Sequence, residues 1–185
     1  MKDPIVQAGD PVLRGKAKPV DKKDIGSRAV AKIIADMKKA LHAEEFGVAI
    51  AAPQIGKPLR IFVISGNVFI EDAAEGGEKK PTPADRVFIN PEITRLSRGK
   101  TERSEGCLSV RGKYGTVIRH DKASIKALDE NGKKITYHGA GLVGHIFQHE
   151  CDHLEGILYT DKAVQLEEDG DMQSARTKLQ QKRAV

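Results

Sequence analysis

The 185-residue sequence predicts an α+β fold, with mixed or antiparallel strands around a central helix and a further helix near the N-terminus. Three observations predict this class. Apolar residues have helical spacing near both ends of the chain, strand-like apolar runs lie between them, and an Asn-Gly turn joins two of those runs. The order of helix, strands and helix is typical of an α+β protein. The sequence has no internal repeat, and its length suits a single domain over residues 1–185.

The first predicted element after an N-terminal loop is an amphipathic helix over residues 28–44. Its apolar residues recur three or four positions apart. They are Val30, Ile33, Ile34, Met37 and Leu41. Lysines occupy intervening positions, so one face would be buried and the other solvated. Ser27 is a suitable N-cap, because its hydroxyl can accept a hydrogen bond from an amide of the first turn.

Four short apolar segments bounded by turn residues are predicted strands. They are residues 59–64, 87–90, 123–128 and 134–137. Asn131-Gly132 favours a hairpin between the last two, since Asn-Gly readily adopts the positive φ that such turns require. A Gly- and Ala-rich turn is expected at residues 46–56. A charged segment rich in Gly and Pro is expected to form a surface loop at residues 71–85.

The last predicted element is a helix over residues 142–154, ended by Gly156. Most of its apolar residues fall near one face. They are Leu142, Val143, Ile146, Phe147 and Leu154. His149, Glu150 and His153 interrupt this pattern with polar groups where a core helix would be apolar. This helix is therefore the first place to look for chemistry.

Composition and charge narrow the class of protein. The chain has only two cysteines, too few for a disulfide-rich secreted fold. No apolar run approaches the roughly 20 residues of a membrane helix, and no apolar signal segment follows the first residues, so the cytoplasm is the predicted location and no membrane partner is expected. The net charge of +5 is compatible with a ribosome surface, but acidic and basic residues are mixed along the chain. No specific nucleic-acid sequence is predicted as a partner.

His149 and His153 are four residues apart, which places both imidazoles on one face of a helix, one turn apart. Two imidazoles in this arrangement can bind one metal ion, and Glu150 can reach a water on that ion. A catalytic site of this kind has three protein ligands and an open position. A metal-dependent hydrolase is therefore predicted.

The third ligand must come from elsewhere in the sequence. Position 159, where some relatives of the motif carry a histidine, is Tyr159, and Glu167 and Glu168 lie in an acidic stretch typical of a surface turn. Cys107 is the better candidate, because Gly106 before it allows close approach of the backbone and a thiolate would complete a Cys-His-His set. Cys151 points about 200° away from the imidazole face and is expected to pack in the core.

Three segments together resemble the peptide deformylase family: Gly47 to Gln54, Glu105 to Ser109, and Gln148 to Gly156. The resemblance covers about residues 3–165, and the tail at residues 166–185 carries no motif. The family removes the formyl group from the N-terminal methionine of new polypeptides and releases formate. N-formylmethionyl peptides are thus the implied substrates, and transient contact with the ribosome is plausible for such an enzyme.

The resemblance implies a role for each residue of the site. Cys107, His149 and His153 would bind one divalent metal ion, with Fe(II) as the first choice and Zn, Ni or Co as alternatives. Glu150 would act as general acid and base, while the Gln54 side-chain amide and the Leu108 backbone N–H would stabilise the oxyanion. Glu105 would pair with Arg119. Candidate substrate-binding residues are Val48, Ala49, Gly106, Leu142 and Ile146.

The sequence departs from the family pattern at two places. Ala49 and Ile50 replace the usual Gly and Leu of the first motif, and Ala49 adds a methyl group where the substrate backbone would lie. Arg111 stands where the family often has Pro, which could change the loop beside the site. Neither departure removes a ligand or Glu150.

Other readings of the motif remain open. A zinc peptidase would share the helix but not the cysteine motif. An RNA- or ribosome-binding module would use a closed structural metal site with a fourth ligand, for which His120, His138 and His145 are available. A family member that has lost its activity would retain the motifs and show no formate release.

Overall fold

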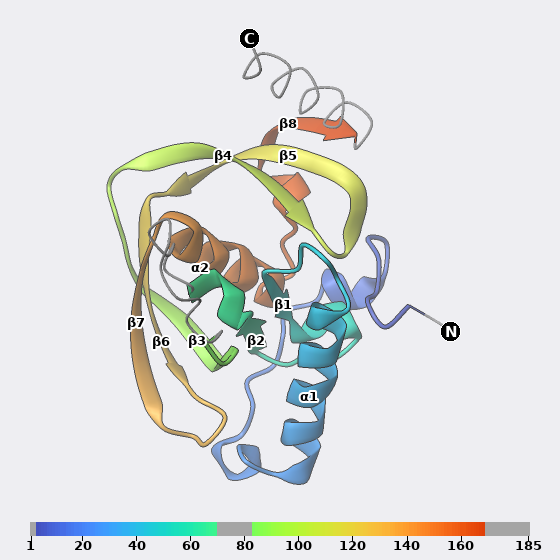
Figure 1. Cartoon of the computed structure of the whole chain (residues 1–185), viewed down its shortest axis with the longest axis vertical. Coiled ribbons are helices and arrows are strands. Elements are labelled where there is room, and N and C mark those ends of the chain that lie inside the picture. Colours follow the sequence, from blue (N-terminus) through green and yellow to red (C-terminus); the bar gives the residue numbers. More distant parts are fainter. Residues whose placement is uncertain (1–2, 70–82, 169–185) are drawn as a thin grey trace, which may run out of the picture.

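The computed structural model describes residues 3–69 and 83–168. In these residues the fold consists of two helices and two antiparallel sheets (Figure 1). The helices are α1 (Arg28–His42) and α2 (Gly141–Leu154). The first sheet has the order β1 (Ala49–Ala51), β2 (Ile61–Ile64), β3 (Arg86–Leu96), β6 (Lys122–Leu128) and β7 (Lys134–Ala140). The second has the order β4 (Lys100–Cys107), β5 (Val110–His120) and β8 (Ala163–Glu168). The predicted α+β class is confirmed.

The five-stranded sheet is covered by a helix on each face. Successive side chains of a strand point to opposite faces. Along β2, Ile61 and Val63 pack with α1 in one cluster, while Phe62 and Ile64 pack with α2 in another. The α2 cluster includes a stack of Phe62 on Phe88, with ring centroids 4.7 Å apart, and Phe147 of α2 packs edge-on against Phe88. Burial on both faces explains why the strand reads as an unbroken apolar run.

Helix α1 begins where the sequence predicts. The Ser27 hydroxyl accepts a hydrogen bond from the Val30 amide at 3.3 Å, and the buried positions include Ile34, Met37 and Leu41. The helix ends at His42, two residues before the predicted end at residue 44.

Helix α2 lies close to the first sheet because two glycines meet there. A Cβ on Gly144 would come within 2.8 Å of the Gly139 carbonyl oxygen on β7. Gln148 then joins the helix to the end of β5: its amide nitrogen donates to the His120 carbonyl at 2.9 Å, and its amide oxygen accepts from the His120 N–H at 3.0 Å. Gly156, with φ of 76°, follows the helix and permits the change of direction. These contacts fix the position of the residues on α2.

The second sheet was not predicted from the sequence. Strand β4 carries mostly exposed side chains and β5 is broken by two glycines, so neither shows a clear apolar alternation. Strand β8 pairs with β5 and extends to Glu168, into the part of the tail for which no motif was found. The second sheet closes over α2 from the side opposite the first sheet (Figure 1).

Several predicted boundaries also change. Residues 49–51, predicted as part of a turn, form the short strand β1, and β3 extends to Leu96 instead of ending at residue 90. Strand β2 begins at Ile61 instead of residue 59. The β6–β7 hairpin is confirmed, with Gly132 at φ of 78°. Most of the predicted loop at residues 71–85 and residues 169–185 of the tail lie outside the described residues.

The predicted N-terminal loop is confirmed apart from two short 3-10 turns, Pro11–Leu13 and Lys22–Asp24. Three more such turns lie elsewhere in the described part of the chain. They are Ala52–Ile55, Gly66–Phe69 and Tyr159–Asp161. Neither helix of the described residues is long and apolar enough to span a lipid bilayer.

Candidate metal centre and active site

Cys107, His149 and His153 converge at one point between the second sheet and α2. Each contributes one ligand atom, and the three atoms lie within 4.8 Å of one another. The Cys107 sulfur is 3.2 Å from Nε2 of His153. Two ligands of one tetrahedral zinc-sized ion are separated by roughly 3.5 Å, given metal–sulfur and metal–nitrogen bonds near 2.3 and 2.1 Å. The cluster therefore fits a single metal ion.

The helix and a neighbouring carboxylate orient the two imidazoles. The centroids of the His149 and His153 rings are 4.9 Å apart, as expected for residues one turn apart. Nδ1 of His149 lies 2.9 Å from Oε2 of Glu105, which leaves Nε2 of His149 for the ligand cluster. A carboxylate on the outer nitrogen is the usual way in which proteins fix a histidine ligand.

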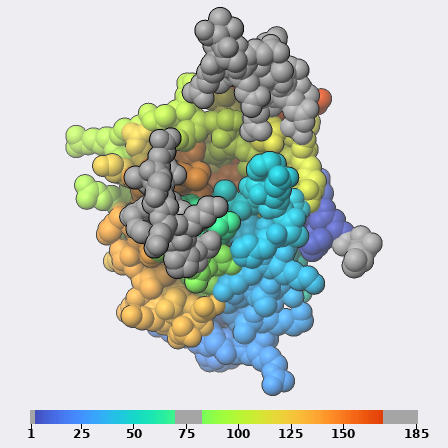
Figure 2. Space-filling model, in the orientation of Figure 1, coloured from blue at the N-terminus to red at the C-terminus, as the bar shows by residue number. Residues whose placement is uncertain are grey.

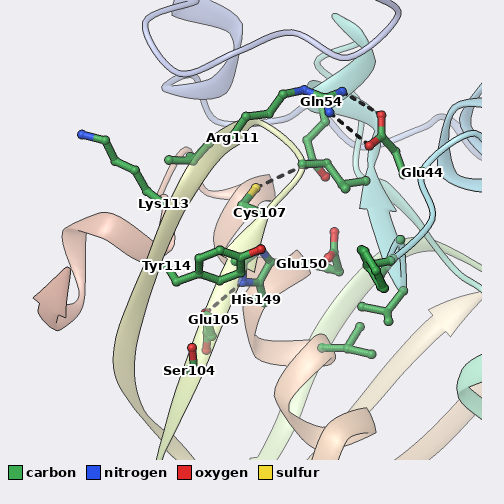
Figure 3. A pocket seen from close by; sticks show the side chains of 18 of the residues that line it. Glu44, Gln54, Ser104, Glu105, Cys107, Arg111, Lys113, Tyr114, His149 and Glu150 are labelled. Atoms are coloured by element: carbon green, nitrogen blue, oxygen red, sulfur yellow. Dashed lines mark hydrogen bonds and ion pairs between the residues drawn. The ribbon is translucent and has the colours of Figure 1, made fainter. Parts of the chain in front are cut away.

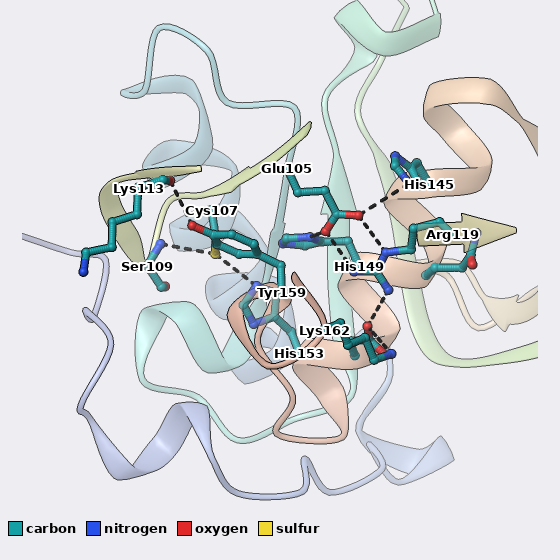
Figure 4. Close-up of polar contacts among 12 residues, drawn as sticks. Glu105, Cys107, Ser109, Lys113, Arg119, His145, His149, His153, Tyr159 and Lys162 are labelled. Atoms are coloured by element: carbon teal, nitrogen blue, oxygen red, sulfur yellow. Dashed lines mark hydrogen bonds and ion pairs between the residues drawn. The ribbon is translucent and has the colours of Figure 1, made fainter. Parts of the chain in front are cut away.

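The Cys107 sulfur accepts two hydrogen bonds. The Ser109 backbone N–H (Figure 4) and the Gln54 side-chain amide (Figure 3) each donate to it, both at 3.4 Å. The amide of Gln54 has a fixed orientation, because its oxygen accepts from the Ala51 N–H at 2.8 Å. The Gln54 N–H group thus faces the ligand cluster. Ser109, which sequence reasoning did not single out, also accepts from Gln54 at 3.2 Å.

Glu150 lies beside the ligands and is 4% exposed. Its Oε2 has no hydrogen-bond partner among the described residues. Burial raises the pKa of Glu150 to about 7, although the positive charge of His149 opposes this effect. A carboxyl group that titrates near neutrality can both accept and donate a proton, which is what a general acid and base requires.

A buried charge network supports His149, one of the three candidate ligands (Figure 4). Arg119 donates to both carboxylate oxygens of Glu105, at 2.7 and 2.9 Å, and to Asp152 at 2.5 Å. Lys162 joins from the surface and donates to Asp152 at 2.7 Å. Burial alone would raise the pKa of Glu105, but Arg119 and His149 lower it strongly, so Glu105 stays ionised. The structure thus has the Glu105–Arg119 pair that the family resemblance implied.

Breaking this network should destabilise the fold. In Arg119→Met, Glu105 would be left as a buried carboxylate without its main partner, and we expect a loss of about 3–5 kcal/mol in the free energy of unfolding. Denaturant titration followed by circular dichroism measures it. Arg14→Met removes an exposed ion pair with Asp161 and is the matched control, with an expected loss below about 1 kcal/mol. Equal losses in the two variants would contradict this account.

A pocket of about 580 Å³ opens next to the ligand cluster. Figure 2 shows atoms of α2 at the bottom of a hollow between β4–β5 and the segment that follows α1. The predicted substrate-binding residues all line it. They are Val48, Ala49, Gly106, Leu142 and Ile146. Cys107, His149, Glu150, Gln54 and Leu108 line it as well. Of the site residues proposed from the three motifs, only His153 is not part of the pocket lining; it lies buried behind it, with the Cys107 sulfur 3.2 Å from its Nε2.

The other cysteine and histidines lie outside the ligand cluster. Cys151 is buried in the α2 core cluster, as expected. His145 lines the pocket, but its Nε2 faces Glu105 at 3.5 Å, away from the ligands (Figure 4). Nδ1 of His138 contacts the Ser124 hydroxyl at 2.8 Å, and Nδ1 of His120 contacts the Ser97 carbonyl at 2.5 Å. Among the described residues the cluster thus has three ligands, and no fourth ligand closes it.

The two departures from the family pattern lie at different parts of the pocket, one in its wall and one at its mouth. Ala49 lies on β1 and is buried at the pocket wall. Arg111 reaches over the pocket mouth to Glu44, with contacts of 2.7 and 3.1 Å, and also contacts Asp3 at 3.1 Å (Figure 3). Arg111 therefore connects the start of β5 to the segment after α1.

A three-ligand Cys-His-His cluster with a buried glutamate beside it, at the bottom of an open pocket, defines the class of mononuclear metal hydrolases. Comparison with known proteins identifies the family. The family model for polypeptide deformylase matches residues 2–169. The chain belongs to the peptide deformylase family, whose members are metal-dependent enzymes that remove the formyl group from nascent polypeptides.

Individual relatives agree with this assignment. The chain is 41% identical to a peptide deformylase of Halothermothrix orenii, with 89% of this chain and 96% of the relative covered. It is also 41% identical to peptide deformylase 1A, chloroplastic/mitochondrial, of Arabidopsis thaliana, with 86% of this chain covered, but it spans only 61% of that relative's length.

Solved structures show the same fold. A class I type b peptide deformylase from Acinetobacter baumannii bound to Met-Ala-Ser superposes with a TM-score of 0.74 at 28% identity, with 85% of this chain and 96% of the other covered. A peptide deformylase from Synechococcus elongatus in complex with actinonin has a TM-score of 0.73 at 31% identity, with 89% of this chain and 81% of the other covered.

Proposed function

We propose that this chain is a peptide deformylase that hydrolyses the formyl group from N-formylmethionyl peptides and releases formate. The observation that carries the proposal is the placement of Glu150, buried and with Oε2 unsatisfied among the described residues, beside the Cys-His-His cluster in an open pocket. The bound Met-Ala-Ser in the Acinetobacter baumannii relative supports a peptide as the substrate class. Neither Ala49 nor Arg111 removes a group that the reaction needs.

Cys107, His149 and His153 would hold one divalent ion. We propose Fe(II) as the resident metal, because a sulfur and two imidazoles accept Fe(II), Zn, Ni or Co and the family resemblance favours iron. When bound, the ion would lower the pKa of a water molecule toward neutrality and polarise the formyl carbonyl. The hydrogen bonds from Ser109 and Gln54 to the Cys107 sulfur hold that sulfur in place beside the two imidazoles.

The remaining chemistry belongs to protein groups. Glu150 would take the proton of the attacking water and deliver it to the departing nitrogen. The Gln54 amide, held by Ala51, would donate a hydrogen bond to the developing oxyanion, and the Leu108 backbone N–H would supply a second donor. One such donor is worth roughly 3 kcal/mol in a transition state.

The substrate backbone would lie between β1 and β4. Each is an edge strand of its sheet in the described part of the chain, and residues of both line the pocket. Gly106 on β4 leaves room for the Tyr114 ring, since a Cβ there would come within 2.9 Å of that ring. Val48, Leu142 and Ile146 would surround the methionine side chain, with Ala49 beside the peptide backbone.

Formate release from formyl-Met-Ala-Ser by the metal-loaded protein tests this function directly. The same protein is then given the acetylated peptide acetyl-Met-Ala-Ser, which has no formyl group, and cleavage of its internal peptide bonds is measured. We expect formate from the first substrate and no cleavage of the second. Cleavage of an internal bond would instead support the zinc-peptidase reading, and no turnover of either substrate would support an inactive family member.

We also propose that the chain works as a single domain in the cytoplasm, in transient contact with ribosomes.

Metal binding should depend on pH because a proton occupies the site without the ion. Burial would lower the pKa of His149, but the neighbouring Cys107 sulfur and Glu105 carboxylate raise it to about 10. Below this value the ion must displace a proton, so the affinity should rise about tenfold per pH unit for each proton displaced. The number of protons released on binding is measured by titrating the metal into the metal-free protein at pH 7, with calorimetry in buffers of different ionisation enthalpy. A binding enthalpy independent of the buffer would contradict it.

A further inference from the structure

One face of the first sheet carries exposed basic side chains along β6. Ala123 and Ile125 of this strand pack in the α2 core cluster. Successive side chains of a strand point to opposite faces, so Lys122, Ser124 and Lys126 point away from α2. Both lysines are exposed. They therefore lie on the side of the sheet opposite to the helix that carries two of the candidate metal ligands.

The two neighbouring strands add polar groups to the same face. In the register of the sheet, Ser124 lies between Arg95 of β3 and His138 of β7, and both of these residues are exposed. Lys126 lies opposite Thr136 of β7. Figure 1 shows β3, β6 and β7 on the side of the molecule away from the N-terminus. We define the cationic face by the following residues of these strands: Arg95, Lys122, Ser124, Lys126, Thr136 and His138.

The positive charge of the cationic face is not neutralised within the described part of the chain. The ion pairs found there involve neither Lys122 nor Lys126, whereas Lys32 and Lys162 each contact a carboxylate. Among the described residues of β3, β6 and β7, Glu92 is the single carboxylate on this face. Cations that no carboxylate balances attract an anionic partner.

A hollow of about 390 Å³ lies at one end of the cationic face, and hydrogen-bond donors line it. Arg95, Lys122, Ser124 and His138 are among the lining residues. Nδ1 of His138 contacts the Ser124 hydroxyl at 2.8 Å, which leaves Nε2 of the same ring for an outside partner. Guanidinium, ammonium and hydroxyl groups are the usual protein partners of a phosphate group, so the chemistry of this hollow suits phosphate oxygens.

We propose that the cationic face binds the phosphate backbone of an RNA duplex. Among the described residues, no Phe, Tyr or Trp side chain lies on this face of the three strands, since Tyr137 packs in the α2 cluster on the other side. The face therefore has no platform on which unpaired bases could stack. A duplex instead exposes phosphates and 2′-hydroxyl groups across a wide, shallow minor groove. Such contacts carry no sequence information, so binding should not depend on base sequence.

The choice of RNA as the nucleic acid rests on the proposed function, because formylated nascent chains emerge beside ribosomal RNA. The hollow in the cationic face and the active-site pocket share no lining residue. A duplex on this face and a peptide in the pocket would thus occupy different parts of the molecule. We therefore expect substitutions on the cationic face to change RNA binding without changing hydrolysis.

The test measures binding of a short, fluorescently labelled RNA duplex to the full chain by anisotropy at several salt concentrations. In Lys122→Gln/Lys126→Gln, the dissociation constant should rise about tenfold at low salt, because two phosphate contacts are lost. The slope of log affinity against log salt concentration should decrease in magnitude by about 2, which is about 1 for each lysine that contacts a phosphate. A second duplex of different base sequence should bind equally well.

Lys18→Gln/Lys57→Gln is the matched control, because it removes the same charge from exposed lysines outside the cationic face. Its dissociation constant should stay within about twofold of the wild-type value, since charges farther apart than a Debye length are largely screened. Formate release from formyl-Met-Ala-Ser is measured for the wild type and both double variants. It should be the same in all of them, because none of these lysines lines the active-site pocket.

The outcomes separate this inference from the function on which it rests. Equal weakening by the two double variants would overturn the cationic face as the site, because only net charge would then matter. Failure of the wild type to bind either duplex at low salt would also overturn it. Tighter binding of a DNA duplex, or of polyglutamate, would overturn RNA as the partner. RNA binding that needs Lys122 and Lys126, together with no formate release by the wild type, would overturn only the proposed function.

Discussion

Replacing Glu150 by glutamine should reduce formate release by about 10²- to 10⁴-fold while the protein keeps its metal. Glutamine has nearly the shape of glutamate but cannot accept the proton of the attacking water. The Cys-His-His cluster is unchanged in this variant, so the loss should appear in kcat with little effect on metal content. Turnover is measured with formyl-Met-Ala-Ser, and metal content by elemental analysis of the same sample.

A matched variant shows whether turnover depends on the glutamate at position 150 or on the loss of any negative charge from this helix. Glu155 follows the same helix and pairs at the surface with Lys16 and Arg60. Glu155→Gln should therefore retain turnover within about twofold, because an exposed ion pair contributes little. If Glu150→Gln kept near wild-type turnover, Glu150 would not be the general acid and base. A loss of metal in Glu150→Gln would mean that the residue acts through the ligand cluster instead.

Elements with a local signal could be predicted from the sequence. Helix α1 and the β6–β7 hairpin depend on residue spacing, an N-cap and an Asn-Gly turn, and all of these act within a few residues. The chemistry of α2 was visible for the same reason, since His149 and His153 must share a face of any helix. Cys107 was found because the two histidines leave a third position to fill.

The second sheet could not be predicted from residue spacing, because charged side chains occupy inward-facing positions of its strands. The inward positions include Glu105 on β4 and Arg119 on β5, where a strand pattern would show apolar residues. These two side chains are tolerated there only because they pair with each other, with His149 and with Asp152. Contacts of this kind join residues far apart in the chain and leave no periodic trace.

The same limit applies within the site. The hydrogen bonds of Ser109 and the role of Asp152 depend on the closure of the second sheet over α2, which brings β4, β5 and the helix together. Sequence reasoning named the candidate ligands but not the groups that hold them. A residue that supports a ligand can be of several types, whereas a metal ligand is restricted to a few side chains.

Cys107→Ala should reduce metal affinity by at least about 100-fold, because loss of a partner behind a ligand already costs 10- to 100-fold. The variant would keep His149 and His153 but lack the sulfur that joins the second sheet to α2 through the ion. Metal-to-protein ratio after dialysis against a weak chelator measures the loss, and formate release should fall in proportion to the metal lost. Retention of one ion per chain would show that the third ligand lies elsewhere.

The second cysteine provides the control, because Cys151 is two residues from each histidine but lies in the core cluster. Burial raises the pKa of its thiol to about 12, so it remains protonated at neutral pH and is not prepared to bind a metal. Cys151→Ala should keep the full metal content and lose about 1 kcal/mol of stability through looser packing. If both variants lost metal equally, the ion would depend on the packing of α2 and not on a sulfur ligand. If only Cys107→Ala lost it, the ligand role would be assigned to the thiolate at the end of β4, and α2 alone would be insufficient to hold the ion.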